Sequence, residues 1–536
     1  MKFSSAILLL CGTLSMAQTH QHAPPPEDGR VDLTAIPVPH QMDGIGLSHI
    51  TITTKSTEAQ QWFDQGLALL HCFWDYEALR AFEQALRLDP DCAMCHWGVA
   101  AALEFRGHGH QDQVKEELTK AKELGEKATD HERRYIRAAN EAHDKKGEDA
   151  GTKEMESLID HYPADVEARL FLALSSNGGY DAKGDPRNGA LYGQQMLRNL
   201  LKEFPENAAA NHYWIHAMEV SGHPEWALES AEKLGRLAPA SGHMVHMPGH
   251  IFYRTGDYER ARQIFLDAKR VDEDYMAKQH VAVRDDWNYA HNISYLIADC
   301  AEAGRYTEAR EHARTLAGLA NDPEHSGNVF FYVLQIGATE DRLAIRFANW
   351  DEAIAHPMQF GMSDDKLSSW ICSYRDGLGR YALGMKNAET GHAAEAEFNS
   401  NQLDALLWRL SQEKLEKDDD KALRDRVLKI LGTASLELRG EIATRQGDLN
   451  MGVALLKRAA DEEKEIGYSE PPQYARPALE VLGAAYTRAG KFNEARAALQ
   501  RFSMHGLTPV LRFMGSRKRG SKRAKRKRLR RLIELS

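Results

Sequence analysis

Residues 59–92 carry the feature that most constrains the fold of this chain. The segment, AQQWFDQGLALLHCFWDYEALRAFEQALRLDPDC, predicts two helices joined by a short turn. Small residues at Gly66 and Ala78 allow antiparallel helices to cross closely, and Trp62 and Phe82 are large enough to fill the space between them. A pair of this kind cannot bury its apolar face alone, so it predicts further copies stacked on it.

The same spacing recurs along the chain and matches the tetratricopeptide pattern of about 34 residues per helix–turn–helix unit. Its clearest copies are 59–92, 208–241, 242–275, 290–323 and 476–502. A hairpin of an ordinary helical bundle is the alternative for a single copy, and the recurrence favours repeats. We therefore expect residues 49–502 to form an all-α tetratricopeptide solenoid, a right-handed superhelix, without a β segment after residue 55.

Composition at the two ends differs from that of the body. The basic start, the apolar run and the small-residue end of residues 1–17 are typical of a secretory signal peptide. Residues 18–48 are polar and Pro-rich, and we expect a flexible leader there. No later apolar stretch reaches the roughly 18 residues that a membrane span needs. The chain is thus predicted to be exported to the periplasm or the cell exterior.

Charge is divided unevenly. Residues 503–536 hold 12 Lys and Arg and one acidic residue, which predicts a basic disordered tail. Because the whole chain has a net charge of −10, the tail's +11 leaves −21 for the rest. A body this acidic excludes a specific nucleic-acid surface.

Histidines recur at equivalent positions of neighbouring repeats. The strings HYWIH and HMVHMPGH space them by three or four residues, which places them on one helix face. First-helix positions of such repeats line the concave groove, so stacking should gather these side chains into one patch. The predicted ligand-binding residues are His212, His216, His243, His246, His250 and His291.

Three interpretations of the histidine patch stay open. Imidazole binds zinc or copper, and His212, His216, His243, His246 and His250 are the candidate metal ligands. A groove for a protein, peptide or organic ligand is the second interpretation. In the third, the rings only hydrogen-bond to each other, to a nearby carboxylate or to backbone. In all three, Pro248 is expected to kink the surrounding helix or to delay its start.

The string Cys92-Ala93-Met94-Cys95-His96 matches the attachment motif of c-type haem. It straddles a repeat boundary, and His96 falls where Trp62 stands in the first copy, pointing between helices. We therefore do not expect haem. A disulfide between Cys92 and Cys95 and a pair of buried thiols are the alternatives.

Catalytic motifs are missing from the sequence. It contains no HExxH and no GxSxG, and the spacing from Gly483 to Lys491 does not fit a phosphate-binding loop. We expect a non-enzymatic binding or scaffolding protein.

Three strings, FDQGLALLHCFWDYEALRAFEQALRLDPDCAMCHWG, HYWIHAMEVSGHPEWAL and GHMVHMPGHIFYRTGDY, resemble a family of exported bacterial tetratricopeptide-repeat proteins of no settled function. The resemblance covers about residues 40–502 and includes the HYxIHA and HMPxHIF strings. It implies that the predicted histidines belong to the family and that no enzymatic activity is attached to it. Tyr or Trp usually follows CAMC in these proteins, which also speaks against haem. The basic tail departs from the family's pattern.

Overall fold

The computed structural model describes residues 30–504 with short gaps at 107–109, 144–147, 182–183, 284–285, 320–331, 356, 359, 361–366 and 416–417. The predicted signal peptide, the first part of the predicted leader and residues 505–536 of the predicted tail lie outside the described residues.

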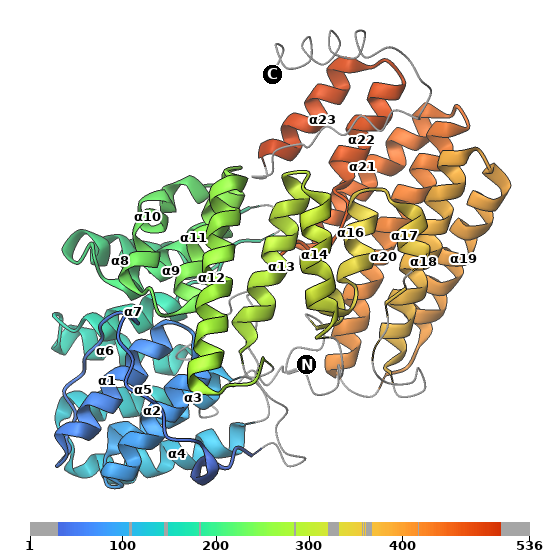
Figure 1. The fold of residues 1–536 in the computed structure, drawn as a ribbon. Helices are drawn as coiled ribbons and strands as arrows, with labels where there is room; N and C mark the ends of the chain where they lie inside the picture. Colours follow the sequence, from blue (N-terminus) through green and yellow to red (C-terminus); the bar gives the residue numbers. More distant parts are fainter. Residues whose placement is uncertain are drawn as a thin grey trace.

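Antiparallel helix pairs follow one another along the chain (Figure 1). The first five pairs are α1 (Thr57–His71) with α2 (Asp75–Leu88), α3 (Ala93–Phe105) with α4 (Gln111–Leu124), α5 (Asp130–His143) with α6 (Glu148–His161), α7 (Val166–Ser175) with α8 (Ala190–Glu203), and α9 (Ala208–Glu219) with α10 (Leu228–Leu237). The two central pairs are α11 (Gly242–Arg254) with α12 (Tyr258–Gln279) and α13 (Trp287–Glu302) with α14 (Tyr306–Ala317).

The remaining pairs are α16 (Thr339–Arg346) with α17 (Trp350–Ala355), α18 (Ser369–Thr390) with α19 (Ala393–Gln412), α20 (Asp418–Arg445) with α21 (Leu449–Ile466), and α22 (Ala478–Arg488) with α23 (Phe492–Met504). Short 3-10 turns η1 (Leu33–Ala35), η2 (Gly125–Lys127) and η3 (Pro224–Ala227) and a π-helical turn η5 (Tyr332–Gly337) complete the described elements.

Each of the five clear sequence repeats corresponds to one helix pair, so the predicted all-α superhelical solenoid is confirmed. First helices of successive units also contact one another, as α9 contacts α11 and α11 contacts α13. Among the described residues the only β feature is an isolated bridge between Tyr180 and Pro186 in the α7–α8 loop. No helix in this part of the chain is both long and apolar enough to cross a membrane.

Glycine sets how closely the helices approach. The buried Phe82 ring of α2 lies between Gly66 on α1 and Gly98 on α3. A Cβ added at either glycine would come within 2.7 Å or 2.4 Å of that ring. Gly249 and Phe265 repeat this contact in the α11–α12 unit. In these units the first helix therefore lies directly against the second helix.

The predicted flexible leader is wrong for residues 30–48. This segment packs on the first units instead, with Ile36 and Ile45 buried. Its backbone is held from α4 and from the turn between α10 and α11: Val31 exchanges two hydrogen bonds with the Gln113 amide, and the N–H of Ala240 donates to Gly44 O at 2.8 Å. The backbone N–H and C=O groups of a polar, Pro-rich segment can form hydrogen bonds with residues that are distant in the sequence. The composition of the segment alone does not reveal such partners.

Gly98→Ala tests the glycine contact. The new methyl group would overlap the Phe82 ring, and overpacking of this kind lowers the free energy of unfolding by about 1–3 kcal/mol. Denaturant unfolding of the variant measures the change.

Gly235→Ala on α10 is the matched control, because a Cβ there meets nothing within 4 Å. Because alanine has a higher helix propensity than glycine, Gly235→Ala should raise the free energy of unfolding by up to about 1 kcal/mol. Equal stability changes in the two variants would contradict the packing argument.

Candidate metal centre

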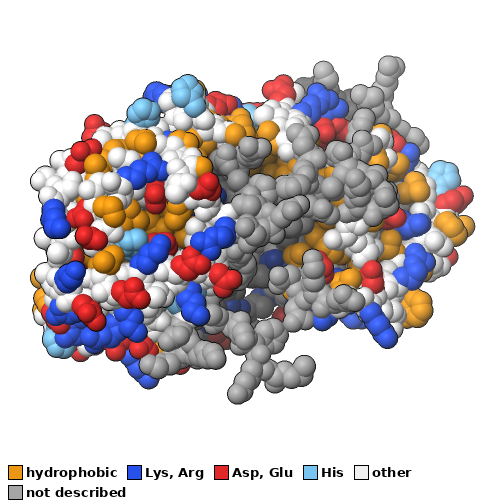
Figure 2. All heavy atoms as spheres, turned by 90° about the horizontal axis from the view of Figure 1, so that it is seen from below, with side chains coloured by type: hydrophobic (Ala, Val, Ile, Leu, Met, Phe, Trp, Pro, Cys, Tyr) orange, Lys and Arg blue, Asp and Glu red, His pale blue; other side chains and the backbone are white. Residues whose placement is uncertain are grey.

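The six predicted histidines come together in the interior. They lie on the first helices of three successive units: His212 and His216 on α9, His243, His246 and His250 on α11, and His291 on α13. None is more than 4% exposed. The histidine-lined groove expected from the sequence is therefore wrong, because the six rings are enclosed; the surface seen in Figure 2 shows only a few scattered histidines.

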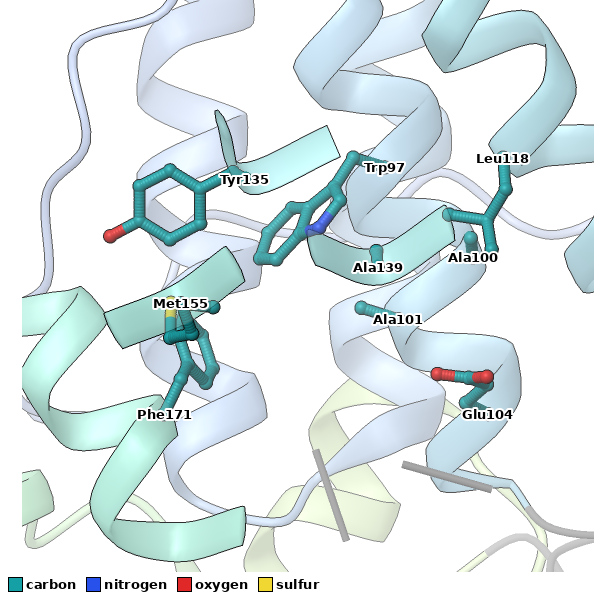
Figure 3. A pocket seen from close by; sticks show the side chains of 9 residues that line it. All are labelled: Trp97, Ala100, Ala101, Glu104, Leu118, Tyr135, Ala139, Met155 and Phe171. Atoms are coloured by element: carbon teal, nitrogen blue, oxygen red, sulfur yellow. The ribbon is translucent and has the colours of Figure 1, made fainter. Parts of the chain in front are cut away.

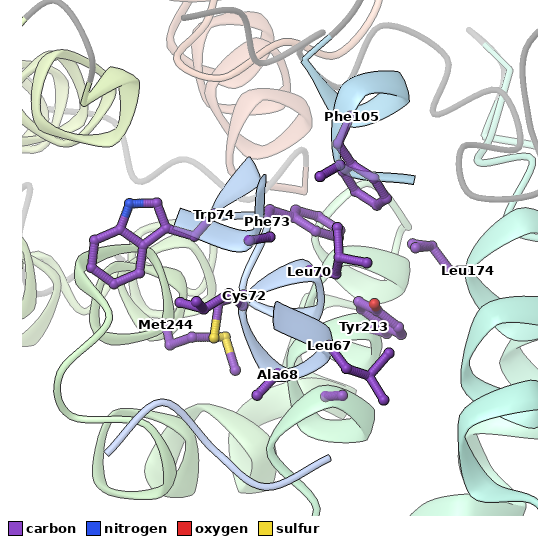
Figure 4. Close-up of a cluster of buried hydrophobic side chains, with 14 of the residues drawn as sticks. Leu67, Ala68, Leu70, Cys72, Phe73, Trp74, Phe105, Leu174, Tyr213 and Met244 are labelled. Atoms are coloured by element: carbon purple, nitrogen blue, oxygen red, sulfur yellow. The ribbon is translucent and has the colours of Figure 1, made fainter. Parts of the chain in front are cut away.

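Distant segments cover the cluster. Phe73, in the turn between α1 and α2, packs on the rings of His212, His216 and His243 with centroid distances of 4.6, 5.2 and 5.7 Å. Figure 4 shows Phe73 among Leu70, Phe105 and Tyr213. Glu470, in the segment between α21 and α22, reaches within 3.7 Å of His250 Nδ1. Two segments that are far apart in the sequence thus enclose the histidines.

Pro248 does not delay the start of its helix. Helix α11 begins at Gly242 and contains Pro248 in its interior. The preceding turn supplies an N-cap, because the Ser241 hydroxyl accepts from the N–H of Met244. The three histidines of this segment therefore lie on one helix, and not on an irregular turn.

The ring nitrogens form two separate groups. In the first set (His212, His216, His243) and in the second set (His246, His250, His291), one ligating atom from each residue lies within 4.8 Å of the others. Nε2 of His212 faces Nε2 of His243 at 3.1 Å. Nε2 of His246 faces Nε2 of His250 at 2.6 Å.

Oxygen acceptors hold the other ring nitrogen of five of these histidines. Nδ1 of His212 lies 2.7 Å from the backbone oxygen of His71, and Nδ1 of His216 lies 2.6 Å from Glu219 Oε1. Nδ1 of His250 contacts the second oxygen of the same carboxylate, Glu219 Oε2. One carboxylate therefore orients a ring in each set.

Side-chain amides complete this arrangement. Nδ1 of His243 lies 3.2 Å from Asn288 Oδ1, and Nδ1 of His246 lies 2.8 Å from Asn292 Oδ1. The amide orientations follow from their other contacts, since Asn288 Nδ2 donates to the Asp272 carboxylate and Asn292 Nδ2 donates to Phe265 O. Both amides thus present oxygen to imidazole.

These contacts determine the tautomer of the facing rings. Carbonyl and carboxylate oxygens only accept hydrogen bonds, so the Nδ1 atoms of His212, His243, His246 and His250 all carry hydrogen. In neutral imidazole the Nε2 atoms then hold lone pairs. Two lone pairs face each other at 3.1 Å in the first set and at 2.6 Å in the second. Each facing pair needs a cation between its nitrogens.

Neither His212 nor His246 is the ring that would carry a bridging proton. Burial, followed by the neighbouring His216, lowers the pKa of His212 well below its ordinary value. Burial and the neighbouring His250 do the same to the pKa of His246. One ring of each facing pair therefore resists protonation at neutral pH.

Carboxyl groups at the cluster differ in charge. Burial alone would raise the pKa of Glu219, but His250 and His216 outweigh it and hold this pKa well below the usual range. Burial and the adjacent Glu219 raise the pKa of Glu470 well above its ordinary value. Behind Asn288, burial and Asp286 raise the pKa of Asp272, and burial raises that of Asp286 to about 7.

Haem does not fit the Cys92–His96 string. Cys92 and Cys95 are joined by a disulfide and are completely buried, so neither thiol is available for a thioether. Both nitrogens of His96 are engaged, Nδ1 with Glu117 at 2.6 Å and Nε2 with Pro90 O at 3.3 Å. The candidate disulfide is the arrangement that the structure adopts, and its burial speaks against redox exchange with a partner protein.

Cavities elsewhere offer less chemistry. The space among Trp97, Tyr135 and Phe171 (Figure 3) is about 10 Å³, room for one water molecule. A second cavity of about 100 Å³ borders α13, α16 and the 471–477 segment. Two of its charged residues, Arg346 and Glu302, pair with each other at 2.9 Å, and Arg342 donates to the backbone oxygens of Leu334 and Pro472.

Several residues of the centre were not predicted from the sequence. Asn288 and Asn292 flank His291 on α13 with helical spacing, which is a signal that could have identified them. Phe73 has a positive φ of 54°, a backbone conformation uncommon for a bulky residue. Nothing in the sequence around Glu470 points to histidines more than 200 positions away.

Comparisons with known proteins show only remote likeness. No protein-family model matches the chain, and no curated protein matches it. Among solved structures, a human IFIT1 dimer with PPP-AAAA is 13% identical with a TM-score of 0.31, covering 83% of this chain and 90% of that one. Yeast Tom70 is 15% identical with a TM-score of 0.32, covering 85% and 93%. A Naa15/Naa10 structure bound to HypK-THB is 15% identical with a TM-score of 0.24, covering 86% and 70%. Likeness at this level carries no functional argument.

Thiol counting tests the cysteine assignment in the chain that lacks residues 1–17. The native protein should react with a thiol reagent mainly at the half-buried Cys372, because Cys72 and Cys300 are buried. Unfolding without reductant should raise the count to three, and unfolding with reductant to five. Five thiols before reduction would contradict the Cys92–Cys95 disulfide.

Proposed function

We propose that this protein binds transition-metal ions, zinc or copper, through its buried histidines. The observation that carries the proposal is the pair of Nε2–Nε2 contacts, at 3.1 and 2.6 Å, between rings whose Nδ1 atoms already donate to oxygen. Metal-bound histidines typically donate their other N–H to a carboxylate or carbonyl in this way.

The distances suit metal ligation. Zinc–nitrogen bonds of about 2.0–2.1 Å place two tetrahedral ligands roughly 3.3 Å apart. The facing atoms of the first set, 3.1 Å apart, match this separation, and those of the second set need to part by about 0.7 Å. A third histidine lies within reach in each set.

A purely structural role of the histidines explains fewer of these contacts than metal binding does. It explains the hydrogen bonds of the Nδ1 atoms, including the two that Glu219 accepts. It does not explain why Nε2 lone pairs point at one another, nor why the buried Nε2 of His216 has no hydrogen-bond partner among the described residues. A bound ion would satisfy all of these atoms.

The metal-binding protein that we propose is an exported repeat protein. The buried Cys92–Cys95 disulfide supports an oxidising compartment, where such bonds persist. Binding rather than catalysis is proposed, because none of the six histidines is more than 4% exposed.

Metal analysis of the protein purified without added chelator tests the proposal. We expect two ions per chain, since each set supplies three imidazoles. His216→Ala and His250→Ala should each reduce the content to about one ion, and the double variant should bind none, measured by mass spectrometry of the metals. Helix content by circular dichroism should stay unchanged.

His223→Ala is the matched control, because this exposed histidine stacks on Trp226 and lies outside both sets. It should keep both ions. Metal content near zero in the wild-type chain after reloading with zinc and with copper would reject the proposal. Loss of helix content in the double variant would assign the histidines to structural packing instead.

A further inference from the structure

We infer that the cavity bordered by α13, α16 and the 471–477 segment binds a small organic carboxylate, an anion with a short apolar body. The inference does not depend on the proposed metal binding, because none of the six histidines lines this cavity. Two observations carry it. An arginine of the lining has no carboxylate partner, and two buried hydroxyl groups of the lining have no hydrogen-bond partner among the described residues.

Arg342 supplies the positive charge of the cavity. Its guanidinium donates to two backbone oxygens, Leu334 O at 3.0 Å and Pro472 O. These contacts orient the guanidinium but do not neutralise it. Burial lowers the pKa of Arg342, and among the described residues only Tyr374 opposes this shift. Because arginine stays protonated in proteins, a part-buried cation without a counter-ion remains at the cavity and favours an anionic ligand.

The other charged groups at the cavity are paired or neutral. Arg346 contacts Glu302 at 2.9 Å and Glu480 at 3.0 Å. Glu463 accepts from the N–H of Ala478 at 2.8 Å. Burial raises the pKa of Glu463 to about 8, so this carboxyl group is mostly protonated at pH 7. Glu463 therefore does not repel an anion, and its proton is a further donor.

Two buried hydroxyl groups line the same cavity. Tyr253 on α11 is 3% exposed, and Thr339 at the start of α16 is 6% exposed. Neither hydroxyl forms a hydrogen bond with a described residue. Burial, followed by Glu302, raises the pKa of Tyr253 well above its ordinary value, so its hydroxyl stays a donor at neutral pH. Buried polar groups normally have partners, and the oxygens of a carboxylate would accept from both hydroxyls.

Apolar side chains complete the lining and favour an organic anion. They include Ile297, Leu343, Pro471 and Pro477. The volume of about 100 Å³ has room for several water molecules or for a ligand of a few non-hydrogen atoms. The cavity reaches the surface, because its lining includes the exposed Pro472. A short hydrocarbon body would cover the apolar walls, whereas an inorganic anion would leave them in contact with water.

Saturation-transfer difference NMR on the full chain tests the inference with three probes. Butyrate carries the charge and the apolar body, butyramide has the same shape without the charge, and phosphate has the charge without the apolar body. We expect butyrate to bind and butyramide to bind at least tenfold more weakly. Phosphate at the same concentration should not displace butyrate.

Substitutions in the lining locate the binding. Arg342→Gln should weaken butyrate binding about ten- to a hundredfold, because a charged hydrogen-bond donor is lost. Tyr253→Phe should weaken it about three- to tenfold without lowering the free energy of unfolding, since the hydroxyl has no described partner in the protein.

Arg458→Gln is the matched control. Arg458 is exposed on α21, pairs with Glu462 on the same helix and does not line the cavity. The affinity for butyrate should stay unchanged in this variant.

Each outcome supports or overturns the inference. Equal binding of butyrate and butyramide, or no binding of butyrate, would overturn it, and displacement of butyrate by phosphate would assign the site to inorganic anions. Unchanged affinity in Tyr253→Phe would place the bound carboxylate elsewhere, and this variant decides if Arg342→Gln does not fold. Metal content is measured separately, so a chain that binds butyrate but no metal would reject the proposed metal binding alone.

Discussion

Close contact between glycine on a first helix and an aromatic ring on a second helix is the constraint on which the first units and the central α11–α12 unit depend. Phe82 fits only because Gly66 and Gly98 lack side chains, and Phe265 fits against Gly249 for the same reason. This contact fixes the distance between successive first helices. Because the histidines stand on three of those helices, the repeat packing itself brings six imidazoles together.

Burial then restricts the partners that the imidazole nitrogens can have. Polar rings in the interior must find hydrogen-bond partners, and Glu219, Asn288 and Asn292 occupy one nitrogen of four of them. The other nitrogens face inward, toward one another. A buried cluster in which five of six imidazoles hold an oxygen at Nδ1 is organised for a cation rather than for a peptide, which could not reach it.

The enclosure of the centre joins parts of the chain that are far apart. Phe73 comes from the first repeat, whereas Glu470 comes from the segment after α21. Residues 30–48 add a backbone contact from Gly44 to Ala240, just before the helix that carries three of the histidines. A residue of the first repeat and a residue of the segment between α21 and α22 therefore both contribute to the environment of the histidines.

The sequence by itself determined the helix–turn–helix unit, its recurrence and the helix faces on which the histidines stand, because these follow from local spacing. Equivalence of repeat positions would pair His212 with His246. The structure instead pairs His212 of α9 with His243 of α11, and it pairs His246 with His250, which stand four residues apart on α11 itself. Only the tertiary structure decided this division into two sets, the burial of the cluster and the approach of Phe73 and Glu470. These features depend on how far the superhelix curves, and curvature is the sum of many packing contacts that no local pattern encodes.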